Sequence, residues 1–262
     1  MKIKNILVGS ALLSSMLFAG GDMEEIVVEE AVVETSAWSF ELEPYLMITS
    51  IEGDTSIGRF TGIPVAVDFS TILDNLDMAF MGHFEVHHQS GWGFWIDYGF
   101  MDLGSETNGP LRGTVSANVR QGVLEAVGLY RQDSGPSQLD YFAGIRWWDN
   151  DIDATIDPAF TPGSRTAGIK IDWVDFIVGA RWAQTLNENW KFRMHGDIGT
   201  GGSALTYGAS AGFIYTINDL LDVDVKYKAT WVDYEEGTYP QRDYFAYDTV
   251  THGLVLGLNF KF

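Results

Sequence analysis

The stretch that most constrains the fold is the last one, residues 248–262. One of its two faces carries almost only apolar side chains: Val250, His252, Leu254, Leu256, Leu258, Phe260 and Phe262. The other face is small or polar: Thr249, Thr251, Gly253, Val255, Gly257, Asn259 and Lys261. This period of two predicts a β-strand. At the edge of a soluble sheet such a face would invite aggregation, whereas a strand that closes a barrel in a membrane turns it to lipid.

The same alternation recurs along most of the chain after residue 37. It predicts about ten strands, an even number as single-chain bacterial barrels require: 38–51, 76–89, 92–103, 114–131, 138–148, 168–183, 190–199, 205–217, 221–234 and 248–262. The expected fold class is all-β, a transmembrane antiparallel up-and-down β-barrel. A soluble β-sandwich also alternates, but it does not need an apolar face on every strand. We expect a bulge at Pro44, because Pro cannot donate to a ladder.

The predicted connections alternate in length. Short turns fall at 90–91, 133–136, 186–189 and 218–219, and longer loops at 52–75, 104–113, 149–167 and 235–247. Short periplasmic turns and long outer loops are typical of outer-membrane barrels. Aromatic residues near the strand ends, such as Trp38 and Trp190 at one rim and Trp173 and Tyr234 at the other, indicate two interfacial girdles.

The first 37 residues differ from the rest. In residues 1–21, Lys2 and Lys4 precede an apolar run, and small residues follow it, so this segment predicts a secretory signal peptide. A transmembrane anchor is the alternative, but the run is short for a membrane helix. Residues 22–37 are acidic and predict a solvated periplasmic tail, with a short helix or a partner contact as the alternative. The barrel then takes residues 38–262.

The charge of the chain excludes one class of partner. There are 16 basic and 36 acidic residues, and removal of residues 1–21 would leave 14 against 36, a net charge of -22. A chain this acidic repels DNA and RNA. Cys is absent, so there is no disulfide, no thiolate metal site and no Cys nucleophile.

Several stretches resemble a known group of proteins. They are Glu43-Pro44-Tyr45, residues 62–85 (GIPVAVDFSTILDNLDMAFMGHFE), 141–147 (YFAGIRW) and 226–231 (KYKATW). The chain is similar, over most of residues 38–262, to uncharacterised proteobacterial outer-membrane β-barrel proteins, sometimes described as porin-like. The final strand, with Phe260 and Phe262 on its apolar face, resembles the C-terminal assembly signal of bacterial outer-membrane barrels. The resemblance implies export to the outer membrane and insertion by the barrel assembly machinery, and it brings no reaction, cofactor or catalytic residue.

The first outer loop contains a helical pattern. We expect a hairpin turned at Thr61-Gly62, then a helix over residues 71–75 capped by Ser70. Phe69, Ile72 and Leu73 fall on one side of it at helical spacing. This apolar side must be buried, either as a constriction in the barrel mouth or against the hairpin of the loop itself, and the sequence leaves both open.

Charged residues on the inward-facing positions are the candidate lumen residues: His83, Glu85, His87, Arg146, Arg181, Arg193 and Asp197. Charges inside a small barrel are expected to pair and fill it, and the alternative is a narrow water path that favours cations. His83, Glu85 and His87 share one face of a strand, yet no motif places a nucleophile beside a base. We therefore expect no catalytic residue, no metal and no cofactor.

Residues 149–157 form an acidic stretch with Asp149, Asp151, Asp153 and Asp157. It is superficially similar to a calcium loop, but Ala154 stands where such a loop needs Gly. We expect a solvated outer loop that holds divalent cations weakly.

These patterns together predict a monomeric, non-enzymatic outer-membrane barrel that acts as a narrow pore or a structural component. Its expected partners are outer-membrane lipid and lipopolysaccharide. The alternatives are a barrel enzyme, such as a protease or lipid hydrolase, and a surface-binding or adhesion barrel that acts through its outer loops.

Overall fold

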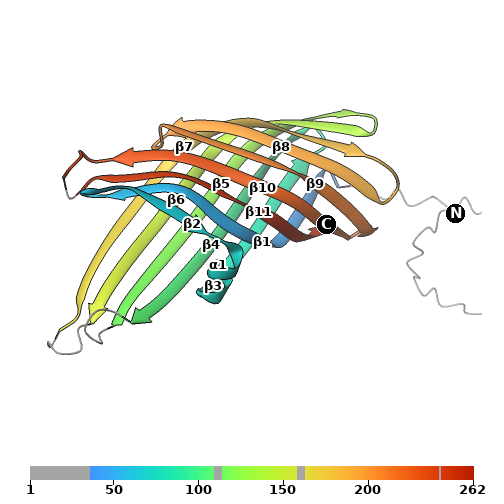
Figure 1. Ribbon diagram of the computed structural model, residues 1–262. Helices are drawn as coiled ribbons and strands as arrows, with labels where there is room; N and C mark the ends of the chain where they lie inside the picture. Colours follow the sequence, from blue (N-terminus) through green and yellow to red (C-terminus); the bar gives the residue numbers. More distant parts are fainter. Residues whose placement is uncertain (1–35, 109–113, 158–162, 242) are drawn as a thin grey trace, which may run out of the picture. The chain divides into compact units, whose positions relative to one another are not determined.

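A computed structural model describes residues 36–108, 114–157, 163–241 and 243–262, so the predicted signal peptide and nearly all of the predicted tail lie outside the described residues. The described residues form one antiparallel sheet and one short helix (Figure 1). The elements are β1 (Trp38–Ile57), β2 (Phe60–Val67), α1 (Phe69–Asp74), β3 (Leu76–His88), β4 (Trp92–Asn108), β5 (Thr114–Ser134), β6 (Ser137–Asp157), β7 (Arg165–Thr185), β8 (Trp190–Gly201), β9 (Leu205–Asn218), β10 (Leu221–Glu236) and β11 (Phe245–Lys261). No helix in the described ranges is long and apolar enough to cross a membrane.

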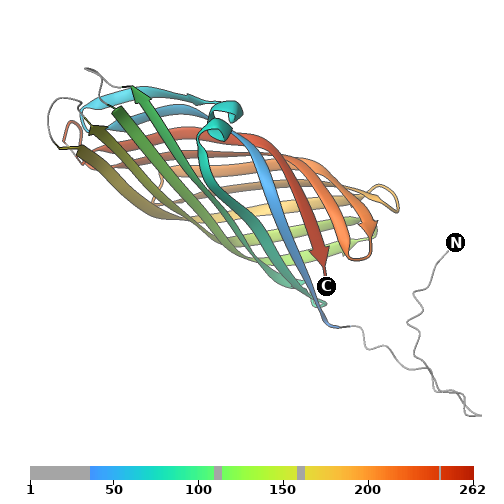
Figure 2. The same ribbon diagram turned by 90° about the horizontal axis from the view of Figure 1, so that it is seen from below.

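The sheet closes on itself because β11 pairs with β1. The pairing runs from Glu41↔Lys261 to Ile57↔Phe245, and Figure 2 shows the resulting barrel from below. Backbone hydrogen bonds in both directions between Phe40 and Phe262, at 3.2 and 2.9 Å, complete the closure at the chain end.

The eleven strands occupy ten positions around the barrel, because β2 and β3 share the same side of β1. β3 pairs with the first part of β1, from Trp38 to Pro44, and β2 pairs with its last part, from Ile51 to Ile57. The helix α1 lies between β2 and β3 in the chain. The ten-strand, all-β transmembrane barrel predicted from the alternation is therefore confirmed.

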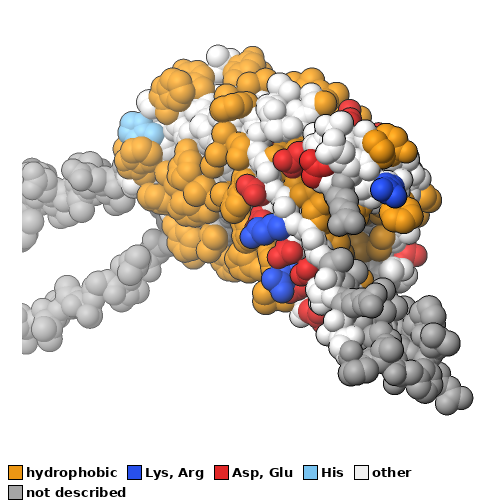
Figure 3. Space-filling view, turned by 90° about the vertical axis from the view of Figure 1, so that its left-hand side faces the viewer, with side chains coloured by type: hydrophobic (Ala, Val, Ile, Leu, Met, Phe, Trp, Pro, Cys, Tyr) orange, Lys and Arg blue, Asp and Glu red, His pale blue; other side chains and the backbone are white. Residues whose placement is uncertain are grey.

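The alternation sorts side chains as the sequence predicts. In β11, Leu254, Leu256 and Leu258 are exposed on the outside, while Val255 and Asn259 are buried inside. Hydrophobic side chains cover much of the face seen in Figure 3, and charged side chains gather there in a narrow group. An apolar outside around a partly polar inside is the arrangement that lipid requires.

Several connections differ from the prediction. The short turns between β3 and β4, β5 and β6, β7 and β8, and β9 and β10 lie at one end, which identifies that end as periplasmic. At the other end the strands continue into the predicted loops, β4 as far as Asn108 and β6 as far as Asp157. The 21-residue strands β5, β6 and β7 exceed the about 9–11 residues needed to cross a membrane. Beyond the membrane the strands stay hydrogen-bonded to one another but no longer need an apolar face. The alternation in the sequence therefore could not show where these strands end.

The first outer loop also departs from the prediction. The hairpin turns at Gly58-Arg59, not at Thr61-Gly62, with Gly58 at φ 60°. The helix begins at Phe69, and its N-cap is Asp68 rather than Ser70. The Asp68 carboxylate accepts hydrogen bonds from the Thr71 N–H at 2.8 Å and the Ser70 hydroxyl at 2.9 Å. Asp68 takes the cap because it directly precedes the first helical residue, from where its carboxylate reaches the N–H of the third one.

Two further expectations are wrong. The ladder between β1 and β3 keeps one register as far as Pro44, with no shift that would mark a bulge. Trp173 and Tyr234 do not belong to an outer girdle, because both are buried in a cluster inside the barrel with Trp148, Ile171, Val232 and Phe245. Trp173 stacks on Tyr234 with ring centroids 4.0 Å apart. Strict alternation places both side chains on the inner face of the sheet, whereas Val174 and Trp231 lie on the outer face.

Candidate functional site

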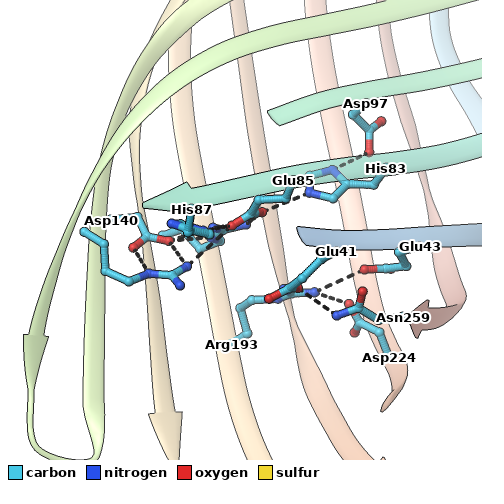
Figure 4. Close-up of polar contacts among 12 residues, drawn as sticks. Glu41, Glu43, His83, Glu85, His87, Asp97, Asp140, Arg193, Asp224 and Asn259 are labelled. Carbon is cyan, nitrogen blue, oxygen red and sulfur yellow. Dashed lines mark hydrogen bonds and ion pairs between the residues drawn. The ribbon is translucent and has the colours of Figure 1, made fainter. Parts of the chain in front are cut away.

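The inward side chains of the periplasmic half form a layer of ion pairs across the lumen, which we call the charged layer (Figure 4). Its members come from β1, β3–β8 and β10: Glu43, His83, Glu85, Asp97, Glu125, Arg131, Asp140, Arg146, Arg181, Arg193, His195, Asp197, Asp224 and Lys226. Each occupies an inward position of its strand, so the alternation that turns apolar residues to lipid also brings these charges together.

Arg181 is the centre of the first group. Its two terminal nitrogens donate to Glu85 at 2.6 and 2.5 Å, and its guanidinium also donates to Asp140 at 2.6 and 2.9 Å. Arg131 donates to Asp140 at 2.7 and 2.9 Å. The guanidinium of Arg181 lies 5.0 Å from the Trp95 ring centre. Two cations between two carboxylates leave no bare charge in this buried group.

Two histidines extend the first group. His83 bridges Glu85 at 3.0 Å and Asp97 at 3.1 Å through its two ring nitrogens. His87 contacts Glu85 through Nε2. Asp97 also accepts a hydrogen bond from the Tyr45 hydroxyl at 2.8 Å. The histidine and acid that the sequence places on one strand are therefore part of the ion-pair layer.

Arg146 is the centre of the second group and is 1 % exposed. It contacts Glu125 at 2.9 Å and Asp197 at 3.0 Å, and donates to Thr206 at 3.1 Å. His195 contacts the other oxygen of Asp197 at 2.9 Å and stacks on Phe142. The Arg146 guanidinium is thus fully surrounded by acceptors.

Arg193 and Lys226 form the third group. Lys226 contacts Glu43 at 3.0 Å and Asp224 at 2.8 Å. Arg193 contacts the same Asp224 and lies 3.7 Å from Glu43. Near the chain end, Asn259 donates to Glu41 at 2.8 Å (Figure 4).

The space left within the charged layer is small. A cavity of about 70 Å³ lies among Glu43, Asp97, Glu125, Arg181 and their neighbours. A water molecule needs at least about 10–15 Å³ of such volume, so the cavity holds a few waters. The arrangement can fix side chains and a few water molecules.

The structure brings together every lumen residue predicted from the sequence: His83, Glu85, His87, Arg146, Arg181, Arg193 and Asp197. Sequence reasoning did not single out Arg131 or Tyr45 as partners, although both lie at inward positions of their strands. Alternation identifies which residues face the lumen, but the shear between strands decides which of them meet.

The residues of the predicted constriction do not share one environment, and their role in closing the barrel mouth stays a prediction. Ile72 of α1 is 5 % exposed and packs with Ile51 of β1 and Met101 of β4. Phe69 is half-buried, and Leu73 is 55 % exposed. The helix therefore packs by Ile72 against inward-facing residues of β1 and β4, and Leu73 does not share that contact.

The predicted acidic loop is part of strand β6. Asn150 points inward and accepts a hydrogen bond from Gln121 at 2.9 Å, and Asp151 lies 4.0 Å from Arg120. Asp149, Asp151 and Asp153 share the outer face of β6, but an extended strand spaces every second residue about 6.6 Å apart, so the three acids do not wrap around one ion as a calcium loop does. No group of three or more metal-binding side chains occurs in the described part of the chain.

Phe260 and Phe262 lie on the outer surface of the barrel at its periplasmic end, 36 % and 74 % exposed. This is the position that the assembly-signal resemblance requires of them, and their recognition by the assembly machinery stays a prediction.

Comparison with known proteins supports the fold. No sequence-family model matches the chain, and no curated protein matches it. The outer membrane protease OmpT from Escherichia coli aligns with a TM-score of 0.52 and 9 % identity, over 87 % of this chain and 99 % of that one. The translocator domain of the autotransporter NalP from Neisseria meningitidis aligns at 0.44 and 11 %, over 88 % and 90 %. Ail of Yersinia pestis, its attachment invasion locus protein, aligns at 0.35 and 10 %, over 87 % and 100 %.

At these identities the likeness concerns the fold alone. A closed barrel with an apolar outside, similar in fold to OmpT, defines the chain as an outer-membrane β-barrel protein. It resides in the bacterial outer membrane.

Proposed function

We propose that the protein is a non-enzymatic outer-membrane barrel whose lumen is closed to solutes, and that it serves as a structural component of the membrane rather than as a pore. One observation carries this proposal. The charged layer crosses the periplasmic half of the lumen, its cations and carboxylates are held by one another, and the two cavities that its residues line measure about 70 and 90 Å³.

Paired charges close a lumen more firmly than apolar side chains of the same size. Moving the Arg181 guanidinium out of the layer would break its contacts with Glu85 and Asp140 together and leave this cation without its partners. Leaving a buried charge unpaired costs about 3–5 kcal/mol. Brief thermal fluctuations therefore open the layer rarely, and hydrated ions pass rarely with them.

The test is single-channel conductance in planar bilayers. Wild-type protein should give no discrete openings. The variant Glu85→Ala, Arg181→Ala, Glu125→Ala, Arg146→Ala removes two ion pairs with both of their partners, so it should give stable openings. The matched control is Asp102→Ala, Arg120→Ala, which removes a pair joined at 3.3 Å whose arginine is 54 % exposed. The closed lumen would be refuted if the wild-type protein gave stable openings and the four-residue variant gave openings of the same conductance.

The proposal that the barrel is not an enzyme rests on the surroundings of His195. Ser210 lies opposite His195 across β8 and β9, and His195 contacts Asp197, so the three residue types of a hydrolase triad are neighbours. Within the described residues, however, no hydrogen bond joins the Ser210 hydroxyl to the His195 ring. Nucleophilic catalysis needs that contact.

Activity assays test this second part of the proposal. Purified protein in detergent should leave casein and phospholipid intact over hours. Hydrolysis that disappears in both Ser210→Ala and His195→Gln, with the barrel still folded, would show an enzyme instead.

A further inference from the structure

The wall of the barrel is interrupted between β1 and β3. Their ladder ends at Pro44↔Gly82, and β1 resumes pairing on that side only at Ile51, with β2. Residues 45–50 of β1 and 76–81 of β3 thus have no strand partner across this side. The register of the β1–β2 ladder is offset by eight residues from that of the β1–β3 ladder. The helix α1 lies within these eight additional residues of the chain. We call this interruption the side gap.

The side gap lies at the level of the outer leaflet. β1 enters the barrel at Trp38, and about 9–11 residues span the membrane, so residues 45–48 belong to its outer half. Met78 and Phe80 on the β3 side are 55 % and 60 % exposed. Unpaired backbone groups facing lipid are costly. The helix α1 contacts β1 and packs its Ile72 on Ile51 at the outer end of the gap, and the polar lumen behind the rest of the gap gives water access to these groups.

A cavity lies directly behind the side gap. Its volume is about 90 Å³, and it is lined by Tyr45, Met47 and Thr49 of β1 and by Met81 of β3. Met101, Val123 and Trp148 complete its apolar wall. Three methionines give this wall an adaptable, polarisable surface suited to small apolar molecules.

The floor of the cavity carries a free cation. Arg131, Arg146, Arg181, Arg193 and Lys226 in the lumen each pair with a carboxylate. Lys228 also lines the cavity, but among the described residues neither a hydrogen bond nor an ion pair within 4.0 Å engages its ammonium group. Its ammonium N–H groups can therefore donate to an acceptor on a molecule bound in the cavity.

The other charges on the floor define the acceptor. They are Asp97, held by His83 and Tyr45, and Glu125 and Arg146, held by each other. Two carboxylates at the floor disfavour an incoming anion, while a neutral carbonyl oxygen can accept a hydrogen bond from Lys228.

From these observations we infer that the cavity binds a small, mostly apolar molecule with a neutral carbonyl oxygen, such as a ketone or an ester. The molecule enters from the outer leaflet through the side gap, places its oxygen on Lys228, and packs its tail against the methionines of the cavity wall. This goes beyond the proposed function, which concerns passage along the axis, and the site stands even if the lumen conducts.

Methyl NMR of the full barrel in nanodiscs tests the site. With 13C-methyl methionine, titration of hexan-2-one should shift Met47, Met81 and Met101 saturably. Met194, 48 % exposed on the outer surface, is the internal control for solvent partitioned into lipid. Hexane and hexanoate, which lack the oxygen or carry a charge, should bind more weakly. Equal shifts of Met194, or no saturable shift at the three cavity methionines, would overturn the inference.

Substitution of the lysine tests the contact. Lys228→Met should weaken hexan-2-one binding about tenfold or more, because a hydrogen bond from a charged donor is lost. Lys228→Arg, which keeps a donor, should restore part of the affinity, and Lys191→Met near the periplasmic rim should leave it unchanged. Equal affinity in wild type and Lys228→Met would overturn the role of Lys228.

A bridge across the side gap tests the route. In Leu46→Cys, Phe80→Cys, a short bismaleimide joins the two banks, and the chain has no native Cys to interfere. Bridging should slow ligand exchange at Met47 and Met81 relative to the unbridged protein. Unchanged exchange would exclude lateral entry, and conductance measured on the same samples reports separately on the closed lumen.

Discussion

Glu85 on β3 and Arg181 on β7 are 96 positions apart, and two parallel hydrogen bonds of 2.6 and 2.5 Å join them across the lumen. The bidentate geometry is the strongest form of a carboxylate–guanidinium contact. It ties opposite parts of the barrel wall to one another through the interior, and it sets several measurable properties of the protein.

The first prediction concerns stability. Arg181→Met should lower the free energy of unfolding by about 3–5 kcal/mol, because it leaves Glu85 and Asp140 buried with fewer partners. Urea unfolding in detergent micelles, followed by tryptophan fluorescence, measures this loss. Arg120→Met removes an arginine that is 54 % exposed, so it should change stability by about 1 kcal/mol or less. Similar losses for the two variants would contradict a special role of the charged layer.

The second prediction concerns the side gap. Leu42 and Phe84 are paired across β1 and β3, and Leu46 and Phe80 would be the next outward pair but one if the ladder continued. Oxidation should therefore form a disulfide in Leu42→Cys, Phe84→Cys and not in Leu46→Cys, Phe80→Cys, since a disulfide needs Cβ atoms about 3.5–4.5 Å apart. Mass spectrometry of digests reads the outcome. Equal yields from both variants would mean that the two strands close in solution.

The third prediction concerns the cap of α1. Hydrogen bonds from Thr71 and Ser70 hold the pKa of Asp68 below its usual value. The cap is therefore fully present above the ordinary carboxyl pKa, and it is lost as the pH falls through the lowered one. Hydrogen exchange at residues 69–74 should be faster in Asp68→Ala at neutral pH, and the difference from wild type should shrink in acid. Ser70→Ala, which leaves the Asp68–Thr71 contact intact, should have a smaller effect.

The fourth prediction concerns assembly. Phe262 closes the barrel through backbone contacts with Phe40, and its side chain is 74 % exposed on the outer surface. Phe262→Ala keeps these backbone contacts and removes only the ring. In cells it should reduce the amount of folded barrel in the outer membrane several-fold, whereas refolding of the purified variant into detergent should match wild type. Equal loss in both settings would assign the ring a folding role rather than one in recognition.

The alternation of apolar and polar residues along the sequence predicted most of the fold. It predicted the ten strand positions and the inward side of the charged-layer residues other than Arg131, because lipid demands the same face of each strand. It did not predict the outer ends of β4 and β6, where ladders continue beyond the membrane. It also misplaced Trp173 and Tyr234, since an aromatic residue near a rim suggested a girdle although its own position pointed inward.

Contacts within the lumen were less predictable. The short β3–β4 turn fixes the pairing of His83 with Asp97, whereas the contacts of Arg146 with Asp197 two strands away and of Arg181 with Glu85 across the lumen do not follow from spacing along the chain. They depend on the shear of the closed sheet, which is a property of all the strands together. The side gap follows from the eight-residue offset between the β1–β3 and β1–β2 ladders. It becomes visible only when the registers of both ladders are known.

Liposome swelling with arabinose tests the closed lumen most directly, because this small sugar would pass through any solute-conducting barrel. Vesicles that contain folded wild-type protein should swell no faster than protein-free vesicles, and vesicles with the variant that lacks the Glu85–Arg181 and Glu125–Arg146 pairs should swell measurably faster. Rapid swelling with the wild type would contradict the account.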